Sequence, residues 1–323
     1  MGGVTLLETQ KTIDRFYKHK TYTILDYGAE GKETEEELNN TLNETLRAID
    51  FAHKNEAIPV VSTKITGLAS NVLLEKIQTD HDLDETEKKE YRSVLKRVDA
   101  LCSYATQKDV ILFFDAEESW LQDSIDHLVN MMMKRYNQEK AIVYNTFQMY
   151  RHDRLQFLID SHNNAKKQKF ILGAKLVRGA YMEKERERAY ENNYDSPIHP
   201  NKSATDDAFN TALKFCVDNL ENIALCNATH NSDSNRYLAE LLVANEIDRN
   251  HPHVMFAQLM GMSDNITFNL GDAGFYVGKY VPYGPVRDVV PYLIRRAQEN
   301  SAVTGDMSRE YALVMEEIKR RGL

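Results

Sequence analysis

Residues 280–300 read Tyr280-Val-Pro-Tyr-Gly-Pro-Val-Arg-Asp-Val-Val-Pro-Tyr-Leu-Ile-Arg-Arg-Ala-Gln-Glu-Asn300. The first residues of this stretch close a strand-like run, and Tyr283-Gly284-Pro285 is a turn signal, after which a helix is predicted to begin near Arg287. Pro291 is compatible with that helix because it falls close to the first turn, where backbone N–H groups lack intrahelical partners. The stretch is therefore a strand, a turn and a helix, and it is the last of eight such units.

The same alternation of short β-branched or aromatic runs with longer helical segments extends along almost the whole chain. Strands are predicted at residues 21–27, 58–64, 110–115, 141–146, 170–177, 223–229, 253–258 and 276–281. Helices are predicted at residues 33–55, from the end of the second strand to residue 101, and at residues 118–136, 151–166, 183–190, 205–221, 235–245, 263–269, 292–299 and 309–320. The pattern predicts an α/β protein, a TIM-like (β/α)₈ barrel that forms one domain over residues 1–323. A doubly wound sheet is the main alternative, but its G-x-G-x-x-G fingerprint does not occur in the sequence.

Composition narrows the function classes. The apolar fraction of 42% allows a large core, and no run approaches the roughly 20 apolar residues that span a bilayer. The net charge of −9 argues against a nucleic-acid partner. Cys102, Cys216 and Cys226 form no C-x-x-C pair, which favours a reducing compartment. The opening Met-Gly-Gly shows no secretory signal, so we expect a protein that is not secreted, although a chain trimmed at this end would look the same.

Polar residues cluster where the predicted strands end, and active sites of (β/α)₈ barrels lie at that face. Mid-strand polar groups would be costly to bury without partners, whereas polar groups at the strand ends converge on one mouth. The residues at or just beyond the strand ends are Lys64, Asp115, Gln148, Lys175, Arg178, Tyr181, Thr229, His230, Asn231, Gln258, Leu259 and Tyr280.

The last predicted helix adds four residues at spacings of three and four, which share one face: Tyr292, Arg295, Arg296 and Glu299. Guanidinium groups bind carboxylates bidentately, and the carboxylate of Glu299 can hold one of them in place. The helix therefore suits a receptor for a small carboxylate. A solvated helix with an ordinary Glu–Arg pair remains the alternative from the helix alone.

The residues at the mouth suit a small amino or imino acid. Its carboxylate would face the cations Lys64, Arg295 and Arg296, which Asp115 and Glu299 balance. Its aliphatic part would contact the apolar surface of Tyr181, Tyr280, Tyr292 and Leu259. The turn Lys175-Leu-Val-Arg-Gly-Ala-Tyr181 suggests a second ligand. Gly179 and Ala180 allow this ligand to approach the backbone closely, and Lys175 and Arg178 could face a phosphate or an electron-rich ring of the ligand. No metal-ligand cluster and no catalytic triad can be proposed from the spacing, so the residues alone do not name the reaction.

Several segments resemble the proline dehydrogenase family. They are Val61-Ser-Thr-Lys64, Asp115-Ala-Glu-Glu118, Lys175-Leu-Val-Arg-Gly-Ala-Tyr181, Ala228-Thr-His-Asn231, Gln258-Leu-Met-Gly-Met262 and the quoted stretch 280–300. The resemblance covers about residues 25–300 and is closest to the monofunctional and mitochondrial branch. It implies a distorted (βα)₈ barrel with non-covalent FAD that oxidises L-proline to Δ¹-pyrroline-5-carboxylate, the first step of proline catabolism. It also implies electron transfer to a membrane quinone with transient membrane contact, in a bacterial cytoplasm or at its inner membrane, or on the matrix side of a mitochondrion.

The resemblance also implies a role for each matched residue. Lys64, Arg295 and Arg296 would hold the proline carboxylate, Asp115 and Glu299 would order those cations, and Tyr280, Tyr292 and Leu259 would enclose the ring. The flavin would be lined by Gln148, Lys175, Arg178, Gly179, Ala180, Tyr181, Thr229, His230 and Asn231, with Lys202 and Thr205 reaching its phosphate or adenosine end. The bifunctional bacterial members have arginine at the position of Lys175, and relatives that oxidise hydroxyproline have a smaller residue at the position of Tyr280, whose bulk favours proline.

Three other functions remain open from the residues. Lys64 or Lys175 could be the nucleophile of a Schiff-base lyase or aldolase. The barrel could bind flavin to reduce a different substrate, such as a folate. It could also be a non-catalytic amino-acid binder.

Overall fold

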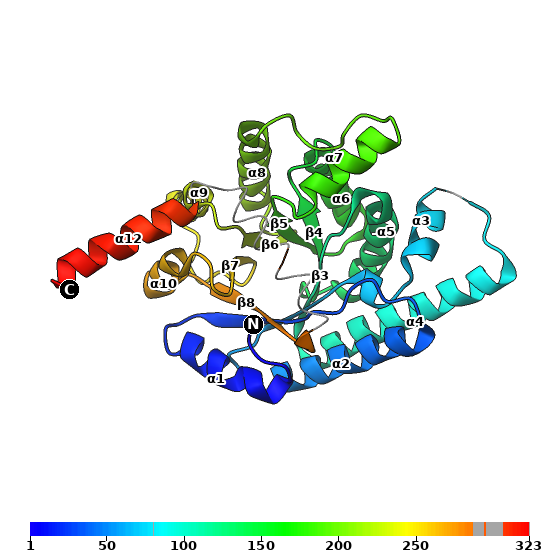
Figure 1. The fold of residues 1–323 in the computed structure, drawn as a ribbon, viewed down its shortest axis with the longest axis horizontal. Coiled ribbons are helices and arrows are strands. Elements are labelled where there is room, and N and C mark those ends of the chain that lie inside the picture. Colours follow the sequence, from blue (N-terminus) through cyan, green and yellow to red (C-terminus); the bar gives the residue numbers. More distant parts are fainter. Residues whose placement is uncertain (80, 287–293, 295–305, 323) are drawn as a thin grey trace.

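A closed barrel of eight parallel strands forms the centre of the computed structural model, which describes residues 1–79, 81–286, 294 and 306–322 (Figure 1). Neighbouring strands in the barrel are neighbours in sequence, and β8 closes the ring by pairing with β1 from Tyr22↔Gly278 to Tyr27↔Tyr283. The strands are β1 (Tyr22–Tyr27), β2 (Val60–Thr63), β3 (Ile111–Phe114), β4 (Val143–Gln148), β5 (Leu172–Val177), β6 (Ile223–Ala228), β7 (Val254–Leu259) and β8 (Val277–Tyr283). The predicted (β/α)₈ barrel is confirmed.

Helices surround the barrel, and several begin at caps that the sequence supplies. Thr34 and Glu37 form a capping box at the start of α2, and Asp84 and Glu87 form another at the start of α4. The helices are α1 (Leu6–Tyr17), α2 (Glu35–His53), the 3₁₀ helix η1 (Ile65–Gly67), α3 (Asn71–Gln78), α4 (Glu85–Lys108), α5 (Ser119–Tyr136), α6 (Arg154–Gln168), α7 (Met182–Glu191), α8 (Lys202–Val217), α9 (Ser232–Ala244), α10 (Asp264–Asp272) and α12 (Asp306–Arg321). Within the described part of the chain, no helix combines the length and apolarity that crossing a bilayer requires.

Side chains alternate between the barrel interior and the surrounding helices, as strand geometry requires. Ile24 belongs to the interior cluster, whereas Leu25 packs in the larger cluster between strands and helices. The interior cluster consists of Ile24, Val60, Phe113, Ala141, Tyr144, Ala224, Cys226, Met255, Ala257 and Tyr280. The interior is therefore a filled core, and polar side chains become frequent only near the carboxyl ends of the strands.

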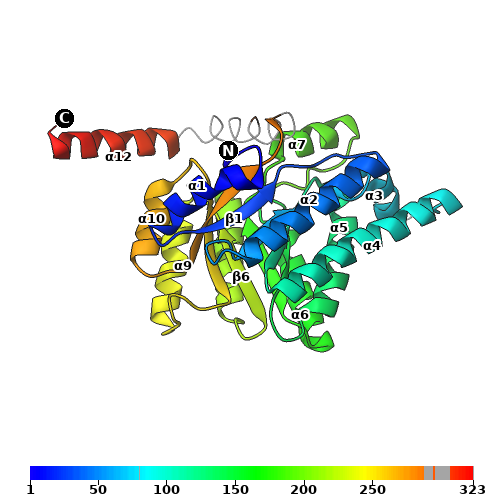
Figure 2. The same cartoon turned by 90° about the horizontal axis from the view of Figure 1, so that it is seen from below.

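An N-terminal helix that the sequence analysis did not predict lies beside β1 and α10 (Figure 2). Ile13 and Phe16 of α1 are buried, and the ring of Phe16 lies 6.4 Å from that of Phe268 in α10. The residues before α1 pair with the end of β8: the N–H of Gly2 donates to the carbonyl of Pro282 at 2.8 Å. Helix α1 thus covers the barrel wall where β1 and β8 meet.

The predicted strand bounds differ from the observed ones by at most two residues. Lys64 and Asp115 directly follow β2 and β3, and Gln148 is the last residue of β4, whereas the predicted strand ended at residue 146. The prediction that Tyr280 ends the eighth strand is wrong, because β8 keeps pairing with β1 as far as Tyr283. Helix α8 begins at Lys202, three residues before the predicted start, since the side chain of Asn201 caps it. The predicted helix at residues 292–299 falls outside the described residues apart from Ile294.

Candidate active site

Asp115 is the hub of a charged cluster at the carboxyl ends of the strands. Its two carboxylate oxygens accept hydrogen bonds from four side chains that come from three strands, β2 with the residue after it, β5 and β8. The donors are the ammonium groups of Lys64 at 3.0 Å and Lys175 at 2.5 Å, and the hydroxyls of Ser62 at 2.9 Å and Tyr280 at 2.7 Å. Lys64, Lys175 and Tyr280 are all buried. The structure therefore brings together residues that the sequence could only place at separate strand ends.

The electrostatics of this cluster fix its protonation states. Burial raises the pKa of the Asp115 carboxyl, but the charges of Lys175 and Lys64 lower that pKa more, so it lies well below its ordinary value. Burial lowers the pKa of Lys64, whereas the charges around it, Asp115 foremost, raise that pKa well above its ordinary value. Asp115 is an anion and Lys64 is a cation across the physiological pH range.

The aromatic wall of this cluster faces Lys175. The ammonium nitrogen of Lys175 lies 5.0 Å from the ring centre of Tyr280 and 5.5 Å from that of Phe113. Both distances allow a cation–π attraction, which helps to hold a buried ammonium group in one position. The hydroxyls of Ser62 and Tyr280 also contact each other. Lys175 thus points across the interior below the mouth.

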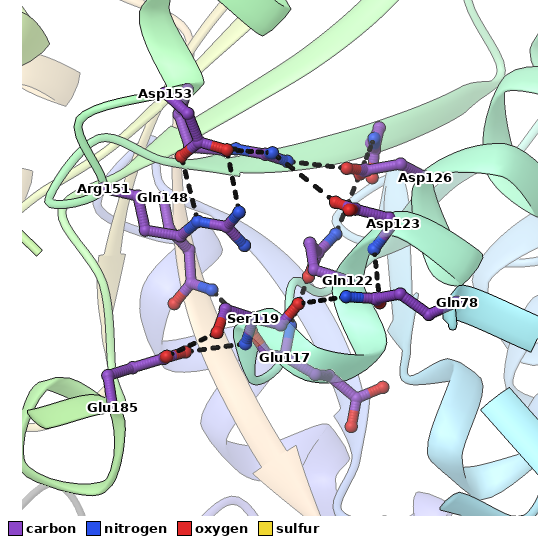
Figure 3. Close-up of polar contacts among 12 residues, drawn as sticks. Gln78, Glu117, Ser119, Gln122, Asp123, Asp126, Gln148, Arg151, Asp153 and Glu185 are labelled. Carbon is purple, nitrogen blue, oxygen red and sulfur yellow. Dashed lines mark hydrogen bonds and ion pairs between the residues drawn. The ribbon is translucent and has the colours of Figure 1, made fainter. Parts of the chain in front are cut away.

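Gln148 connects the end of β3 to the turn after β5. Its side-chain N–H donates to the carbonyl of Glu117 at 2.7 Å (Figure 3). Its carbonyl oxygen accepts from the N–H of Ala180 at 3.2 Å. The carboxylate of Glu117 in turn accepts hydrogen bonds from the backbone and the hydroxyl of Thr66 in η1. Burial raises the pKa of Glu117 to about 7.

The turn at residues 178–181 lies close to the aromatic ring of Tyr150. Gly179 has a φ of +148°, and a Cβ atom at this position would lie 2.4 Å from the ring of Tyr150. Only glycine fits such an approach without strain. The ring that Gly179 approaches belongs to the protein, and the close approach of a ligand at Gly179 stays a prediction.

Helix α7, which follows this turn, is attached to the start of α5. The N-cap residue of α5, Glu118, makes no capping bond through its own side chain. The buried carboxylate of Glu185 from α7 instead accepts hydrogen bonds from the N–H and the hydroxyl of Ser119, both at 2.6 Å (Figure 3). Lys184 adds an ion pair to Glu118 at 2.8 Å. These contacts fix the position of Tyr181, the buried N-cap residue of α7.

Arg178 joins the ends of β5 and β6 to helices α8 and α9. Its guanidinium donates to Asp206 at 2.8 Å, to the hydroxyl of Thr229 at 2.7 Å and to that of Ser234 at 3.0 Å. It also lies 4.4 Å above the ring of Phe209. Because three nitrogens of the guanidinium donate to residues in three different parts of the fold, the Arg178 side chain has little freedom of orientation.

The residues after β6 are held by local hydrogen bonds. The hydroxyl of Thr229 accepts from the N–H of Asn231, and Asn231 caps α9 by accepting from the N–H of Ser234. A ring nitrogen of His230 lies 3.0 Å from the hydroxyl of Ser263. Thr229, His230 and Asn231 thus form one ordered corner beside Arg178.

The N-terminus of α8 places the two remaining predicted cofactor residues. Lys202 is its first residue and pairs with Asp206 at 2.6 Å, while Thr205 is buried in the first turn. Because Asp206 also accepts from Arg178, Lys202 and Arg178 share one carboxylate. The structure therefore connects this end of α8 to the β6 corner.

Leu259, at the end of β7, is held through the buried Lys279 of β8. The ammonium group of Lys279 donates to the carbonyls of Leu259 and Met262 and pairs with Asp264 at 2.8 Å. Four predicted residues, Tyr292, Arg295, Arg296 and Glu299, lie outside the described residues. Across the described ranges, no group of three or more His, Cys, Asp or Glu residues could hold a metal ion.

The sequence analysis missed several residues that belong to this site. Ser62 lies two residues before Lys64, and Asp26 lies two residues after the interior Ile24, so strand alternation alone could have placed both on the inner face. Glu117 directly follows the quoted Asp115-Ala pair, but no sequence pattern distinguishes it from its neighbour Glu118. Asp206 and Ser234 lie on helices, and only the fold brings them to Arg178.

The closed parallel barrel and the charged cluster at the carboxyl ends of its strands define a (β/α)₈-barrel protein with its candidate site where barrel enzymes have theirs. Residues 9–309 match the family model described as proline dehydrogenase. The chain belongs to the proline dehydrogenase family.

Two relatives of known name and one solved structure are similar to this chain. The chain is 39% identical to "Proline dehydrogenase 1, mitochondrial" of Drosophila melanogaster over 73% of its own length, but it spans only 36% of that protein. It is 32% identical to "Carbapenem antibiotics biosynthesis protein CarD" of Pectobacterium carotovorum over 99% of its length and 83% of that protein. The crystal structure of proline utilization A from Bdellovibrio bacteriovorus, inactivated by N-propargylglycine, has the same fold, with a TM-score of 0.83 and 20% identity over 93% of this chain and 32% of that one.

Proposed function

We propose that this protein is an FAD-dependent dehydrogenase that oxidises L-proline to Δ¹-pyrroline-5-carboxylate, with hydride transfer from proline C5 to N5 of the flavin. The Asp115 cluster is the observation that supports this proposal most. It holds two buried lysines and a tyrosine around one carboxylate at the barrel mouth, where the family membership leads us to expect a substrate that carries a carboxylate.

On the substrate side, Lys64 is the described cation that we assign to the proline carboxylate. Its bond to Asp115 leaves the other ammonium protons available for a ligand. Arg295 and Arg296 are proposed to complete this anion site, with Glu299 ordering them, as the resemblance implies. Tyr280 and Leu259, together with Tyr292, would enclose the aliphatic ring of the substrate.

On the cofactor side, the residues fit a flavin dinucleotide by their donor chemistry. Lys175, buried below the mouth, supplies positive charge of the kind that stabilises a reduced flavin. Arg178, Thr229 and Asn231 supply donors beside the N-terminus of α9, and Lys202 lies at the N-terminus of α8. Helix N-termini with nearby cations suit the pyrophosphate of a dinucleotide. Bound FAD would supply the two-electron acceptor, and the protein would supply position and charge.

We further propose that the electrons pass to a quinone, as the resemblance implies. A quinone acceptor requires transient contact with a membrane, at the inner membrane of a bacterium or on the matrix side of a mitochondrion. The family relatives of animals and plants whose names include "mitochondrial" support the second location for a eukaryotic chain.

Anaerobic titration with L-proline tests the proposal directly. The purified protein should show flavin absorbance, and L-proline should bleach it, whereas D-proline should not. A protein that binds flavin but is not bleached would be a binder or a different flavin enzyme, and NADH-dependent bleaching would point to the latter. Borohydride trapping of an aldehyde substrate on Lys64 or Lys175 in a flavin-free protein would instead establish a Schiff-base enzyme.

A further inference from the structure

We propose that Asp26 accepts the proton that the substrate ammonium group must lose before hydride leaves the adjacent carbon. This inference rests on the proposed oxidation of proline, and it assigns the acid–base step of that reaction to a residue on β1. Proline in water carries a protonated secondary amine, whose nitrogen has no lone pair to drive the loss of hydride. The site therefore needs a proton acceptor at its mouth.

The position of Asp26 follows from strand alternation and register. Ile24 faces the barrel interior and Leu25 faces the helices, so Asp26 faces the interior again, one layer nearer the mouth. Asp26 pairs in register with Ser62 on β2, whose hydroxyl donates to Asp115. It pairs on the other side with Pro282 of β8. Asp26 is 2% exposed and lies beside the charged cluster.

Asp26 and Asp115 have different surroundings. Asp115 accepts hydrogen bonds from both lysines and from two hydroxyls. No such bond to the carboxylate of Asp26 is found among the residues that the structure describes. The charged and titratable groups that face Asp26 are Lys64 after β2, Asp115 after β3, Lys175 on β5, Glu30 in the loop after β1, and Tyr280 and Tyr283 on β8.

These surroundings separate the acid strengths of the two groups. Burial is the main cause that raises the pKa of Asp26, to about 7, with the negative charge of Asp115 adding to it and the two lysines opposing it. The same lysines hold the pKa of Asp115 far below its ordinary value. Neighbouring groups whose pKa values are pushed apart take different roles: Asp115 stays charged and orders the cations, and Asp26 exchanges a proton near neutral pH.

The proposed step balances in atoms and charge. The N–H bond of the ammonium breaks, its proton moves to the Asp26 carboxylate, and the nitrogen keeps the electron pair. That pair forms the C5=N bond as the C5–H bond breaks and its two electrons leave with the hydride. The substrate loses two electrons to the flavin, which is the oxidant of the proposed function, and Asp26 later returns its proton to water.

The pH dependence of kcat/KM for total L-proline distinguishes a protein base from a pre-deprotonated substrate. With Asp26 as the base, kcat/KM falls below about pH 7 and is level above it. Without a base, only proline whose amine is already neutral can react. Because the fraction of neutral amine rises tenfold per pH unit, kcat/KM then rises tenfold per pH unit toward the pKa of an alkyl ammonium group, about 10. We expect the first profile for the wild-type protein and the second for Asp26→Asn, with a loss of roughly 10²- to 10⁴-fold at pH 7.5.

Two further variants separate catalysis from structure. Asp26→Glu should restore the level region above about pH 7 at a reduced rate, because it returns the carboxylate. Asp272→Asn, which removes an exposed carboxylate at the end of α10, should leave the profile unchanged. A second readout needs no substrate. The folded-state pKa of Asp26 lies above its ordinary 3.8, so the wild type loses stability as pH rises from about 4 to about 7. The melting temperature of Asp26→Asn relative to wild type should therefore rise over that window.

The outcomes are distinct. Failure of the wild type to oxidise proline at any pH refutes the proposed function itself. Oxidation of proline with the same pH profile in wild type and Asp26→Asn overturns the assignment of Asp26 alone. If Asp26→Asn does not fold, the pH profile of the wild-type protein is the test. A wild-type kcat/KM that keeps rising tenfold per pH unit up to pH 9 means that no protein base operates.

Discussion

The hydroxyl of Tyr280 on β8 donates a 2.7 Å hydrogen bond to Asp115, which follows β3 and lies 165 positions away in the sequence. Strands β8 and β3 are not neighbours in the barrel, so this bond crosses the interior and ties its two sides together at the level of the candidate site. The same carboxylate holds both buried lysines. The charges of the mouth are therefore organised by one residue.

Replacement of this carboxylate should be costly. Asp115→Asn leaves Lys64 and Lys175 buried without their anion, and removal of one partner from a buried ion pair costs about 3–5 kcal/mol. Urea denaturation should show a loss of that size in the free energy of unfolding. Asp218→Asn, which breaks an exposed pair with Lys214, should change it by less than about 1 kcal/mol. Equal effects in the two variants would contradict the central position of Asp115.

Loss of the Tyr280 hydroxyl alone should have a smaller effect. Tyr280→Phe keeps the ring and removes one donor to a charged acceptor, which is worth about 1.5–3 kcal/mol. We expect lower stability than wild type but higher stability than Asp115→Asn. The two single variants and the double variant form a mutant cycle, and a coupling energy near zero would show that the bond does not contribute.

Arg178 should determine the affinity for flavin. Arg178→Ala removes a guanidinium that is held by Asp206, Thr229 and Ser234, and loss of one charged hydrogen bond to the cofactor weakens binding roughly 10- to 100-fold. Fluorescence titration of the flavin-free protein with FAD measures this change. Arg236→Ala, an exposed arginine on α9, is the control and should bind FAD like the wild type. Wild-type affinity in Arg178→Ala would remove this residue from the cofactor site.

Gly179 should tolerate no side chain. Gly179→Ala places a Cβ atom 2.4 Å from the ring of Tyr150 at a φ of +148°, so both a clash and backbone strain arise. We expect a loss of about 2–3 kcal/mol in the free energy of unfolding and weaker binding of FAD. Gly274→Ala has a φ of +86° but no atom within 4 Å, so it isolates the strain and should cost about 1–2 kcal/mol. A smaller loss in Gly179→Ala than in Gly274→Ala would show that the ring of Tyr150 moves aside freely.

Glu117 should make stability depend on pH. Its pKa is about 7 in the folded protein against an ordinary 4.5, so between these values the folded state keeps a proton that the unfolded chain has lost. Its contribution to stability is therefore present below about pH 4.5, declines as pH rises to about 7 and is absent above that. Glu117→Gln should gain melting temperature relative to the wild type from pH 5 to about pH 7, and the difference should be level from there to pH 8. A constant difference over the whole range from pH 5 to pH 8 would show that Glu117 is ionised throughout.

The paired arginines are proposed to set the affinity for substrate, although they lie outside the described residues. Arg295→Met or Arg296→Met should raise the KM for L-proline roughly 10- to 100-fold, because each removes a charged hydrogen bond to the carboxylate. Steady-state kinetics measure this change. Unchanged KM values in both variants would refute the assignment of the carboxylate.

Much of the fold could be predicted because each strand–helix unit is a local pattern. The apolar runs before Asp115 and Arg178 mark their strands, and the polar residues directly after those runs mark the mouth. Helix α1 was missed because its buried positions are few: Thr9, Ile13 and Phe16 are its only buried residues, and one of them is polar. The end of β8 was placed too early because pairing with β1, which the sequence does not show, extends the strand to Tyr283.

The sequence by itself determined the eightfold alternation, the charged residues at the strand ends and the family to which they belong, because period and composition are properties of neighbouring residues. Only the tertiary structure decided that the carboxylate of Asp115 accepts hydrogen bonds from both Lys64 and Lys175. It also decided that Asp26 faces the same mouth without a hydrogen-bond donor from the described residues. The physical reason is that the protonation state of a buried carboxyl depends on which charges lie within a few ångströms of it, and strand register across a closed barrel sets those distances.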